Sequence, residues 1–212
     1  IHDNKTRLKI ISFFLKSKIK IFVKNQENFS HIDIIKVILK KMNFSYSEDS
    51  LDIFSFKKLT NTKKNNLIQL HFDEKWIHND YIKKFINIEP NKSEIINFII
   101  NLKRKSEKKL IITTGKKTPN ILKQISHLTK ELDFEIYENL SFNELETITM
   151  KSKILISCHG AISHVAAAYN IKQIDIIDGS YNYGRWTSHF RNYNFLYREK
   201  FNILNEKIIK KI

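Results

Sequence analysis

The chain has 212 residues, of which 42% are hydrophobic, so it is long enough to bury the core of one large domain or of one and a half ordinary ones. Its 37 Lys and Arg against 22 Asp and Glu give a formal net charge of +15 and a pI of about 9.7. Mean hydropathy is −0.38, and no apolar run approaches the roughly 18 residues of a membrane span, which excludes a spanning helix from the sequence.

The first 59 residues are interpreted as the end of a domain. A helix is predicted near residues 7–15, a short strand at 19–23, and a second helix after Ser30, which is its predicted N-cap. The chain begins at Ile1 within a predicted strand end, and we therefore expect an N-terminal portion of this domain to be missing. The polar segment TNTKKNN at 60–66 is predicted to link it to a second domain.

Strand and helix patterns alternate after this linker. Strands are predicted at 67–71, 109–115, 134–138, 153–157 and 173–178. Helices are predicted at 93–105 with Ser93 as N-cap, at 119–132 with Pro119 in the first turn, at 141–152 with a Ser141–Glu144 capping box, at 160–170, and at 198–212. This alternation predicts an α/β fold, with a parallel sheet that helices cover on both faces.

The ends of these strands are the first place to search for a function, because ligands of parallel sheets bind at the carboxyl ends of the strands. The predicted ends are His71, Thr114–Lys116, Glu138–Leu140, Ser157–Gly160 and Asp178–Ser180. We therefore expect a binding site among these residues.

The segment SCHGAISH, from Ser157 to His164, combines a strand end, a glycine turn and the start of an Ala-rich helix. The first turn of a helix has unpaired N–H groups and the positive end of the helix dipole, which favour a phosphate ligand. A tight turn without a ligand accounts for the same pattern, so both interpretations stay open. His159 and His164 are five residues apart instead of the four that place two metal ligands on one helical face, and no metal site is predicted.

The single cysteine of the chain, Cys158, excludes an internal disulfide and suits a reducing compartment. It is predicted to be a small buried residue. A Cys–His nucleophile pair with His159 is not expected, because adjacent strand residues point to opposite sides of a sheet.

Two further segments carry basic and aromatic residues. Lys75 and Trp76 follow the strand that ends at His71, where a lysine can neutralise a phosphate as a point charge. Arg185 belongs to the stretch YGRWTSHFRNYNFLYR, whose arginines and aromatics are typical of recognition surfaces. A solvated surface lysine and a loop packed at a domain edge are the alternatives. His71, Trp76 and Arg185 are accordingly candidates for lining a cleft.

The segment HGAISHVAAA, His159–Ala168, resembles the D-[ST]-G-x-x-H-x-A-A-A pattern of glycosyltransferase family 9, the family of the ADP-heptose:lipopolysaccharide heptosyltransferases. His164 and the three alanines match the pattern. His159 replaces the family Asp, Gly160 stands at the Ser/Thr position, and Ala161 replaces the family Gly.

Three other segments extend this resemblance over most of the chain. Lys75-Trp76 is similar to the family's Lys-x-Trp loop without the spacer. LIITTGKK resembles a strand and turn of the family, and ENLSFNELETITMKSKILIS resembles the segment before the glycine turn. The resemblance implies two facing Rossmann-like domains of the B-type glycosyltransferase architecture, the first only partly present. Residues 1–59 would belong to the acceptor-side domain and 60–197 to the donor-binding domain, and the helix at 198–212 would cross back to the first domain.

The resemblance also implies a function. The chain would transfer a sugar from a nucleotide-diphosphate sugar to a cell-envelope glycolipid or glycan, with inversion and without a metal or other cofactor, and the general base would lie in the missing N-terminal region. The protein would be cytoplasmic, with peripheral contact to an anionic membrane surface as an option. The residues implied to bind the donor are Lys75, Thr114, Gly115, Leu140, His159, Gly160, Ala161 and His164.

Two other classes of function compete with a transferase. The changed motif is compatible with a non-catalytic relative that binds nucleotide sugars or glycans. The high positive charge is compatible with nucleic-acid binding, but the lysines are spread along the chain and no recognised nucleic-acid motif occurs. Lysine and isoleucine are abundant throughout the chain, so a general compositional bias explains the charge as well. A partner other than nucleic acid is therefore expected.

Overall fold

The computed structural model describes residues 29–47 and 66–212, and these residues fall into two units. One unit contains helix α2 (His31–Lys41) and the short helix α7 (Gly184–Thr187), and the other contains the β-sheet. The predicted helix near 7–15, the strand at 19–23 and nearly all of the linker at 60–66 lie outside the described residues.

Helix α2 begins where the sequence predicts, after Ser30. The Ser30 hydroxyl accepts a hydrogen bond from the N–H of Asp33 at 3.2 Å, and the Asp33 carboxylate accepts one from the N–H of Ser30 at 2.9 Å. This capping box satisfies two backbone donors at the start of the helix.

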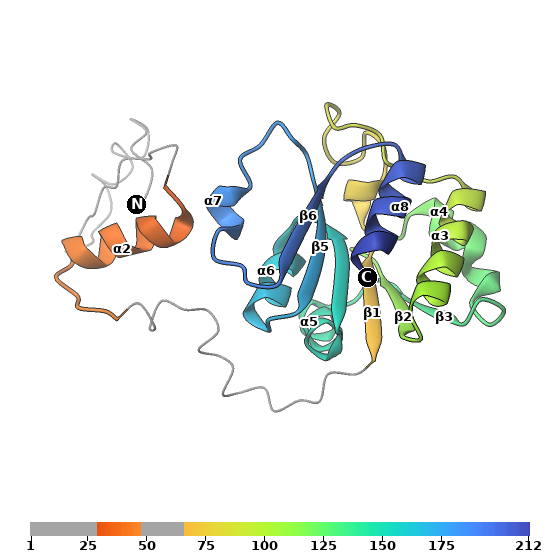
Figure 1. Cartoon of the computed structure of the whole chain (residues 1–212), viewed down its shortest axis with the longest axis horizontal. Coiled ribbons are helices and arrows are strands. Elements are labelled where there is room, and N and C mark those ends of the chain that lie inside the picture. The colour runs from red at the N-terminus through yellow and green to blue at the C-terminus, as the bar shows by residue number, and fades with distance from the viewer. Residues whose placement is uncertain (1–28, 48–65) are drawn as a thin grey trace. The chain divides into compact units, whose positions relative to one another are not determined.

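The sheet has six strands in the order β3-β2-β1-β4-β5-β6, and every neighbouring pair is parallel (Figure 1). The strands are β1 (Leu67–His71), β2 (Lys109–Thr113), β3 (Phe134–Tyr137), β4 (Ile154–Cys158), β5 (Lys172–Ile177) and β6 (Tyr193–Tyr197). The predicted α/β fold and the single parallel sheet between Leu67 and Asp178 are confirmed. Strand β6, where the sequence pattern predicted no strand, adds one edge to that sheet.

The connections between strands are helical. They are η3 (Glu74–Trp76), α3 (Lys92–Lys105), α4 (Asn120–Ile125), η4 (Ser126–Leu128), α5 (Phe142–Lys151) and α6 (Ala161–Ala168), and α8 (Phe201–Lys211) follows the last strand. The strand order runs outward in both directions from the β1–β4 pair, as in a doubly wound Rossmann-like sheet.

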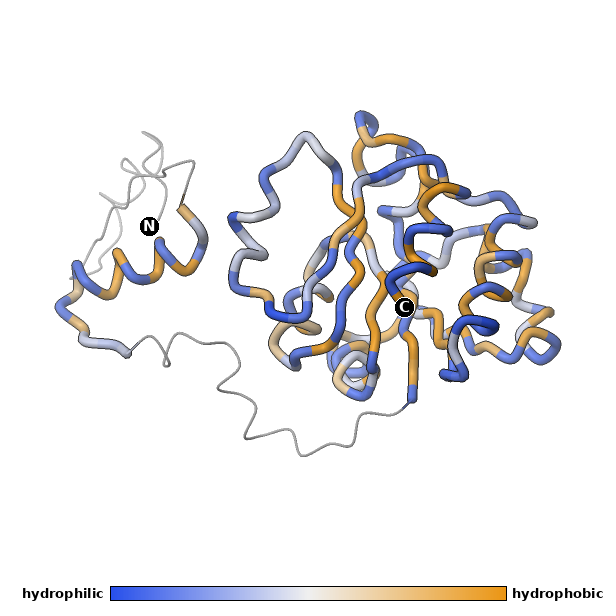
Figure 2. Tube along the Cα trace, in the orientation of Figure 1, coloured by the Kyte–Doolittle hydropathy of each residue, from blue (hydrophilic) through white to orange (hydrophobic). Residues whose placement is uncertain are grey.

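Helices cover both faces of the sheet. Phe98 of α3, Leu122 of α4 and Leu204 of α8 pack in one buried cluster with alternate strand residues such as Leu70 and Ile156. A smaller cluster joins Leu155 to residues of α6 on the opposite face. Figure 2 shows the hydrophobic stretches along the strands and along one side of the helices. The larger apolar core therefore lies under α3, α4 and α8.

The face under α5 and α6 is more polar, because several of the strand residues that alternate onto it are polar. Gln69, Thr113, Ser157, Gln173 and Asp175 are all completely buried. The Gln69 amide donates to the Thr113 hydroxyl at 3.1 Å, and the Ser157 hydroxyl donates to Asp175 at 2.8 Å. These bonds satisfy polar groups that burial would otherwise leave unpaired.

Helices α3 and α4 differ from the prediction for identifiable reasons. Helix α3 is capped by Asn91 instead of Ser93, since the Asn91 side chain accepts from the N–H of Glu94 at 2.9 Å and Glu94 accepts from the N–H of Asn91 at 2.8 Å. The helix predicted at 119–132 ends early and continues as the 3₁₀ turn η4. The Ser126 hydroxyl there donates to the Lys123 carbonyl at 2.9 Å, a local bond that competes with a regular helix.

The C-terminal helix α8 packs against α3 and β6 within the sheet-containing unit. Its residues Phe201, Leu204 and Ile208 belong to the large core cluster. The proposed domain limits at residues 59 and 197, and the crossing of this helix to the first domain, stay predictions.

Candidate functional site

The order of the strands singles out one position along the carboxyl edge of the sheet. Strand order reverses between β1 and β4, and ligands of doubly wound sheets bind at such a switch point. The chain leaving β1 forms the turn η3, and the chain leaving β4 passes through His159 and Gly160 into α6. Lys75 in η3 and Gly160 before α6 were both predicted to bind the donor. They lie on the two sides of this switch point.

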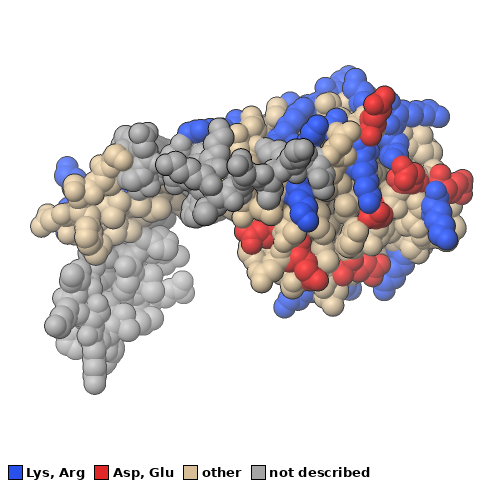
Figure 3. All heavy atoms as spheres, turned by 90° about the horizontal axis from the view of Figure 1, so that it is seen from below, with Lys and Arg blue, Asp and Glu red and all other residues tan. Residues whose placement is uncertain are grey.

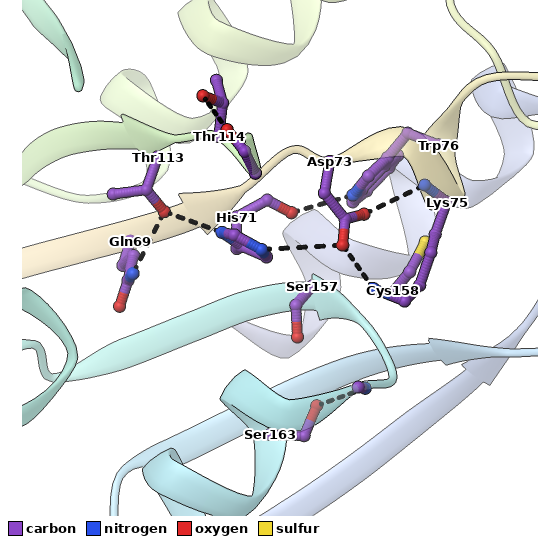
Figure 4. A network of polar contacts seen from close by, with 12 residues as sticks. Gln69, His71, Asp73, Lys75, Trp76, Thr113, Thr114, Ser157, Cys158 and Ser163 are labelled. Atoms are coloured by element: carbon purple, nitrogen blue, oxygen red, sulfur yellow. Dashed lines mark hydrogen bonds and ion pairs between the residues drawn. The ribbon is translucent and has the colours of Figure 1, made fainter. Parts of the chain in front are cut away.

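The turn after β1 is organised by a buried aspartate (Figure 4). The Asp73 carboxylate accepts from the backbone N–H of Lys75 at 3.1 Å and forms an ion pair with the Lys75 ammonium. The indole of Trp76 donates to the His71 carbonyl at 2.9 Å and stacks on Phe72 with ring centroids 4.9 Å apart. Trp76, a candidate cleft residue, is instead fully buried as the anchor of this turn.

His71 connects the turn to β2. Its Nδ1 lies 3.0 Å from the Thr113 hydroxyl, and its Nε2 lies 3.6 Å from the Asp73 carboxylate. Thr113 accepts from the Gln69 amide, so its own hydrogen can be donated to His71 Nδ1. A hydrogen on Nε2 then faces the Asp73 carboxylate.

The charges of Asp73 and Lys75 stabilise one another. Burial alone would raise the pKa of Asp73, but the hydrogen bond and charge of His71 and the charge of Lys75 hold that pKa below its usual value. Burial would lower the pKa of Lys75, and the Asp73 carboxylate outweighs it and raises the pKa. The site therefore carries an ammonium ion at neutral pH, oriented by a buried carboxylate.

Arg198 holds the other side of the same turn. It is buried, its Nη2 donates to the Lys75 carbonyl at 2.9 Å, and its Nε donates to the Ile86 carbonyl at 3.1 Å. Its guanidinium carbon lies 4.9 Å from the centroid of the Phe85 ring. Arg198 thus fixes the backbone that carries Lys75, and it adds positive charge beside the site.

Two glycines leave room for the side chains of the η3 turn. A Cβ atom on Gly160 would lie 3.1 Å from Lys75 Nζ, and one on Gly115 would lie 3.1 Å from a Glu74 carboxylate oxygen and 3.6 Å from the Cβ of Asp73. Gly160 has φ −177°, an extended backbone that any residue can adopt. The glycine matters at this position because of the close approach of Lys75.

Helix α6 starts directly after Gly160. The Ser163 hydroxyl accepts from the N–H of Gly160 at 3.2 Å, so this backbone donor is used within the turn. Ala166 and Ala167 are buried, which explains the Ala-rich sequence as close packing of α6 on the sheet. A ligand at this end of α6 would therefore meet the next backbone donors, beginning with the N–H of Ala161.

His159 is bound to a buried acid on the neighbouring strand. Its Nδ1 lies 2.9 Å from one Asp175 carboxylate oxygen, while the other oxygen accepts from Ser157 at 2.8 Å. The His159 ring lies 5.6 Å from that of His164, which is exposed on α6 and packs edge-on against Phe190 at 5.2 Å. Where the family pattern has Asp, this chain has a histidine paired with an Asp from β5.

The remaining predicted residues are more scattered. Thr114 is buried, donates to the Gly115 carbonyl at 3.0 Å and accepts from the N–H of Asn139 at 3.4 Å, so it joins the ends of β2 and β3. Leu140 lines a separate cavity of about 350 Å³ with Tyr137 and residues of α5. Arg185 belongs to α7 in the other unit. The structure brings together Lys75, Gly115 and Gly160, with His71 and Trp76 behind them.

Cys158 is buried in the large core cluster, on the face opposite Ser157. Burial, with the charge of Asp73, raises the pKa of its thiol far above the usual range, which leaves it protonated and unsuited to nucleophilic attack. Within residues 29–47 and 66–212, no group of three or more His, Cys, Asp or Glu side chains is arranged to hold a metal ion.

Solved structures of glycosyltransferases share this fold. E. coli heptosyltransferase WaaC with ADP aligns with a TM-score of 0.61 at 13% identity, over 96% of this chain and 62% of that one. The same enzyme with ADP-2-deoxy-2-fluoro heptose gives 0.59 at 13% identity, over 96% and 61%. A glycosyl transferase of family 9 from Veillonella parvula DSM 2008 gives 0.50 at 13% identity, over 91% and 56%.

These likenesses establish the fold of a family 9 heptosyltransferase for this chain, which spans roughly three fifths of the length of these proteins. No family model and no curated protein matches the chain by sequence. In the part of the chain that the structure describes, no helix has the length and hydrophobicity needed to cross a bilayer.

Proposed function

We propose that this chain is part of a glycosyltransferase and that its sheet-containing unit binds the nucleotide-diphosphate part of a sugar donor. The observation that carries the proposal is the position of the Lys75 ammonium beside Gly160 at the β1–β4 switch point. The fold supports it, since solved structures of the same fold are heptosyltransferases, one of them with bound ADP.

The diphosphate would lie between the turn η3 and the start of α6. Lys75 has three N–H donors, and its bond to Asp73 uses one of them. The remaining donors and the first backbone N–H groups of α6 would bind phosphate oxygens, helped by the dipole of that helix. The close approach of the turn to Gly160 and Gly115 would keep the site narrow.

The proposed reaction is a single displacement with inversion. A hydroxyl of the acceptor attacks the anomeric carbon of the donor sugar, the bond from that carbon to the phosphate oxygen breaks, and a base takes the hydroxyl proton. Lys75 would stabilise the negative charge that develops on the leaving diphosphate, so the proposal requires neither a metal nor another cofactor. We assign no described residue as the base, and we expect it in an N-terminal domain.

The proposed acceptor is a glycolipid or glycan of the cell envelope, which the protein would bind at the cytoplasmic side of the membrane. A relative that binds donor sugars without transfer is the second candidate, and the replacement of the family Asp by His159 favours it. Binding of a nucleotide sugar without release of the nucleoside diphosphate, measured with the full-length protein and a suitable acceptor, would support this candidate over the transferase.

Lys75→Ala tests the donor site directly. We expect it to weaken the binding of ADP or UDP by about 1–3 kcal/mol, the usual size of a charge-assisted hydrogen bond. Lys153→Ala is the matched control, because it removes the same charge from an exposed residue that precedes β4, at the opposite edge of the sheet. Calorimetric affinities equal to those of the unaltered chain for both variants would contradict the proposal.

A further inference from the structure

The pair formed by His159 and Asp175 lies next to the proposed donor site and is not needed to explain the fold around Lys75. Asp175 is completely buried in β5, and the His159 side chain is 8% exposed. The backbone N–H of His159 donates to the Ile176 carbonyl at 3.1 Å, which ties the end of β4 to β5. Gly160, the next residue, is the one that Lys75 approaches.

The hydrogen bond between the two side chains determines which ring nitrogen carries the hydrogen. A carboxylate can only accept, so the hydrogen between Asp175 and His159 lies on Nδ1. In the neutral ring Nε2 then has a lone pair and no hydrogen. Any hydrogen bond that Nε2 makes with a ligand must therefore be one that it accepts.

The surroundings restrict the ring as well as its hydrogen. The His159 ring lies 5.6 Å from the His164 ring and 6.5 Å from the Phe190 ring, and those two rings also contact each other at 5.2 Å. Asp175 is itself fixed by the Ser157 hydroxyl at 2.8 Å. The small exposed share of His159 suits contact with a single ligand group and not with a broad surface.

We propose that Asp175 is a positioning residue that makes His159 the acceptor of a hydrogen bond from a hydroxyl group of the bound sugar donor. This inference rests on the proposed donor site. The hydroxyl can belong to the ribose of the nucleotide or to the transferred sugar, and both present the same donor to Nε2. Asp175 acts through His159 and touches no ligand itself.

Asp175→Asn tests the proposal because it keeps the shape of the side chain. Ser157 donates to one carboxylate oxygen, so the asparagine oxygen is expected to stay with Ser157 and its NH₂ group to face His159. That group donates to Nδ1 and moves the ring hydrogen to Nε2. His159 would then present a donor to the ligand hydroxyl. Ser157→Ala is the control, since it alters the carboxylate environment and leaves the bond to His159.

Two measurements on the 212-residue chain decide the matter. Nitrogen-15 NMR of the His159 ring should find the hydrogen on Nδ1 in the unaltered chain and in Ser157→Ala, and on Nε2 in Asp175→Asn. Calorimetry with ADP, 2′-deoxy-ADP and ADP-glucose, and with the UDP series, should show about a tenfold loss in Asp175→Asn for the probes that carry the hydroxyl. A loss shared by ADP and ADP-glucose but absent with 2′-deoxy-ADP identifies the ribose 2′-hydroxyl, and a loss shared by all three probes identifies the ribose 3′-hydroxyl. A loss with ADP-glucose alone identifies the sugar.

The proposal is overturned if the unaltered ring carries its hydrogen on Nε2 or on both nitrogens, or if Asp175→Asn moves the hydrogen while every affinity is unchanged. If Asp175→Asn does not fold, His159→Phe replaces it, and an unchanged affinity per folded molecule overturns the proposal. If the unaltered chain binds none of the probes, the proposed donor site is contradicted, and this inference is contradicted with it. If the unaltered chain binds the probes and the variants bind them equally well, only the role of His159 is contradicted.

Discussion

Replacing Gly160 by alanine is the most specific perturbation of the proposed donor site, because the added atom would meet one side chain. The new Cβ would lie 3.1 Å from Lys75 Nζ and 3.3 Å from its Cε, closer than the ordinary contact range that begins near 3.4 Å. The tip of a lysine side chain can move by the few tenths of an ångström needed. The ammonium would then be displaced from its place between Asp73 and the start of α6.

The expected effect on stability is small. The backbone of Gly160 is extended, so alanine adds no strain there. Gly→Ala reduces the entropy of the unfolded chain and stabilises a protein by about 0.4–1 kcal/mol, which offsets a weakened ion pair of similar size. We therefore expect a melting temperature within a few degrees of that of the unaltered chain.

The expected effect on binding is larger. A displaced Lys75 loses a charge-assisted hydrogen bond to the diphosphate, worth about 1.5–3 kcal/mol, or roughly 10- to 150-fold in affinity. Calorimetry with ADP and UDP measures it. Gly179→Ala is the control, because a Cβ on Gly179, which follows β5, would make an ordinary contact of 3.7 Å with the ring of Tyr197 in β6. Equal affinities for both alanine variants and the unaltered chain would refute the reasoning.

Two other substitutions test the charges and rings around this site. Asp73→Asn should lower the free energy of unfolding at neutral pH by about 1–3 kcal/mol, since it leaves Lys75 without its acid. The lowered pKa of Asp73 means that its contribution is present above its unfolded-state pKa and is lost as pH falls through the folded-state value. Denaturant titrations at several acidic pH values should therefore show a shallower acid loss in the variant, and an equally steep loss would count against the ion pair. His164 is predicted to bind the donor, and its ring is exposed. His164→Ala should therefore reduce nucleotide-sugar affinity with little change in melting temperature. A lower melting temperature with unchanged affinity would make His164 a structural residue.

The fold could be predicted because its elements depend on local patterns. The five strands between Leu67 and Asp178 are short apolar runs between helical patterns. The N-cap at Ser30 and the capping box at Ser141 were both predicted from the sequence. The N-cap of α3 was predicted wrongly, at Ser93. Asn91 and Ser93 are both good N-caps, and Asn91 is the cap because Glu94 lies three residues after it. Strand β6 was missed because its aromatic residues alternate at a partly exposed sheet edge, without an apolar run.

The candidate site was predicted in part. Lys75, Gly115 and Gly160 were predicted from their positions after strands of a parallel sheet. The structure brings them close together, and their role in binding a donor stays a prediction. Asp175 and Arg198 were missed because their partners lie on segments that only the fold brings close to them. Asp73 was missed although its partners His71 and Lys75 are two residues away in the sequence. One signal was available: an aspartate inside the apolar run QIDIID must be paired if that strand is buried, and Asp175 is paired with Ser157 and His159.

The two missed aspartates have a common physical role. Asp73 orients an ammonium and Asp175 orients an imidazole, each from a buried position at the carboxyl edge of the sheet. A buried carboxylate competes with a phosphate for the same N–H donors, so Asp73 must reduce the intrinsic affinity of Lys75 for an anion. It also removes most of the entropy that a flexible lysine would lose on binding. In a reaction that must release a charged diphosphate, a cation that is already oriented and only moderately attractive favours the developing charge without holding the product.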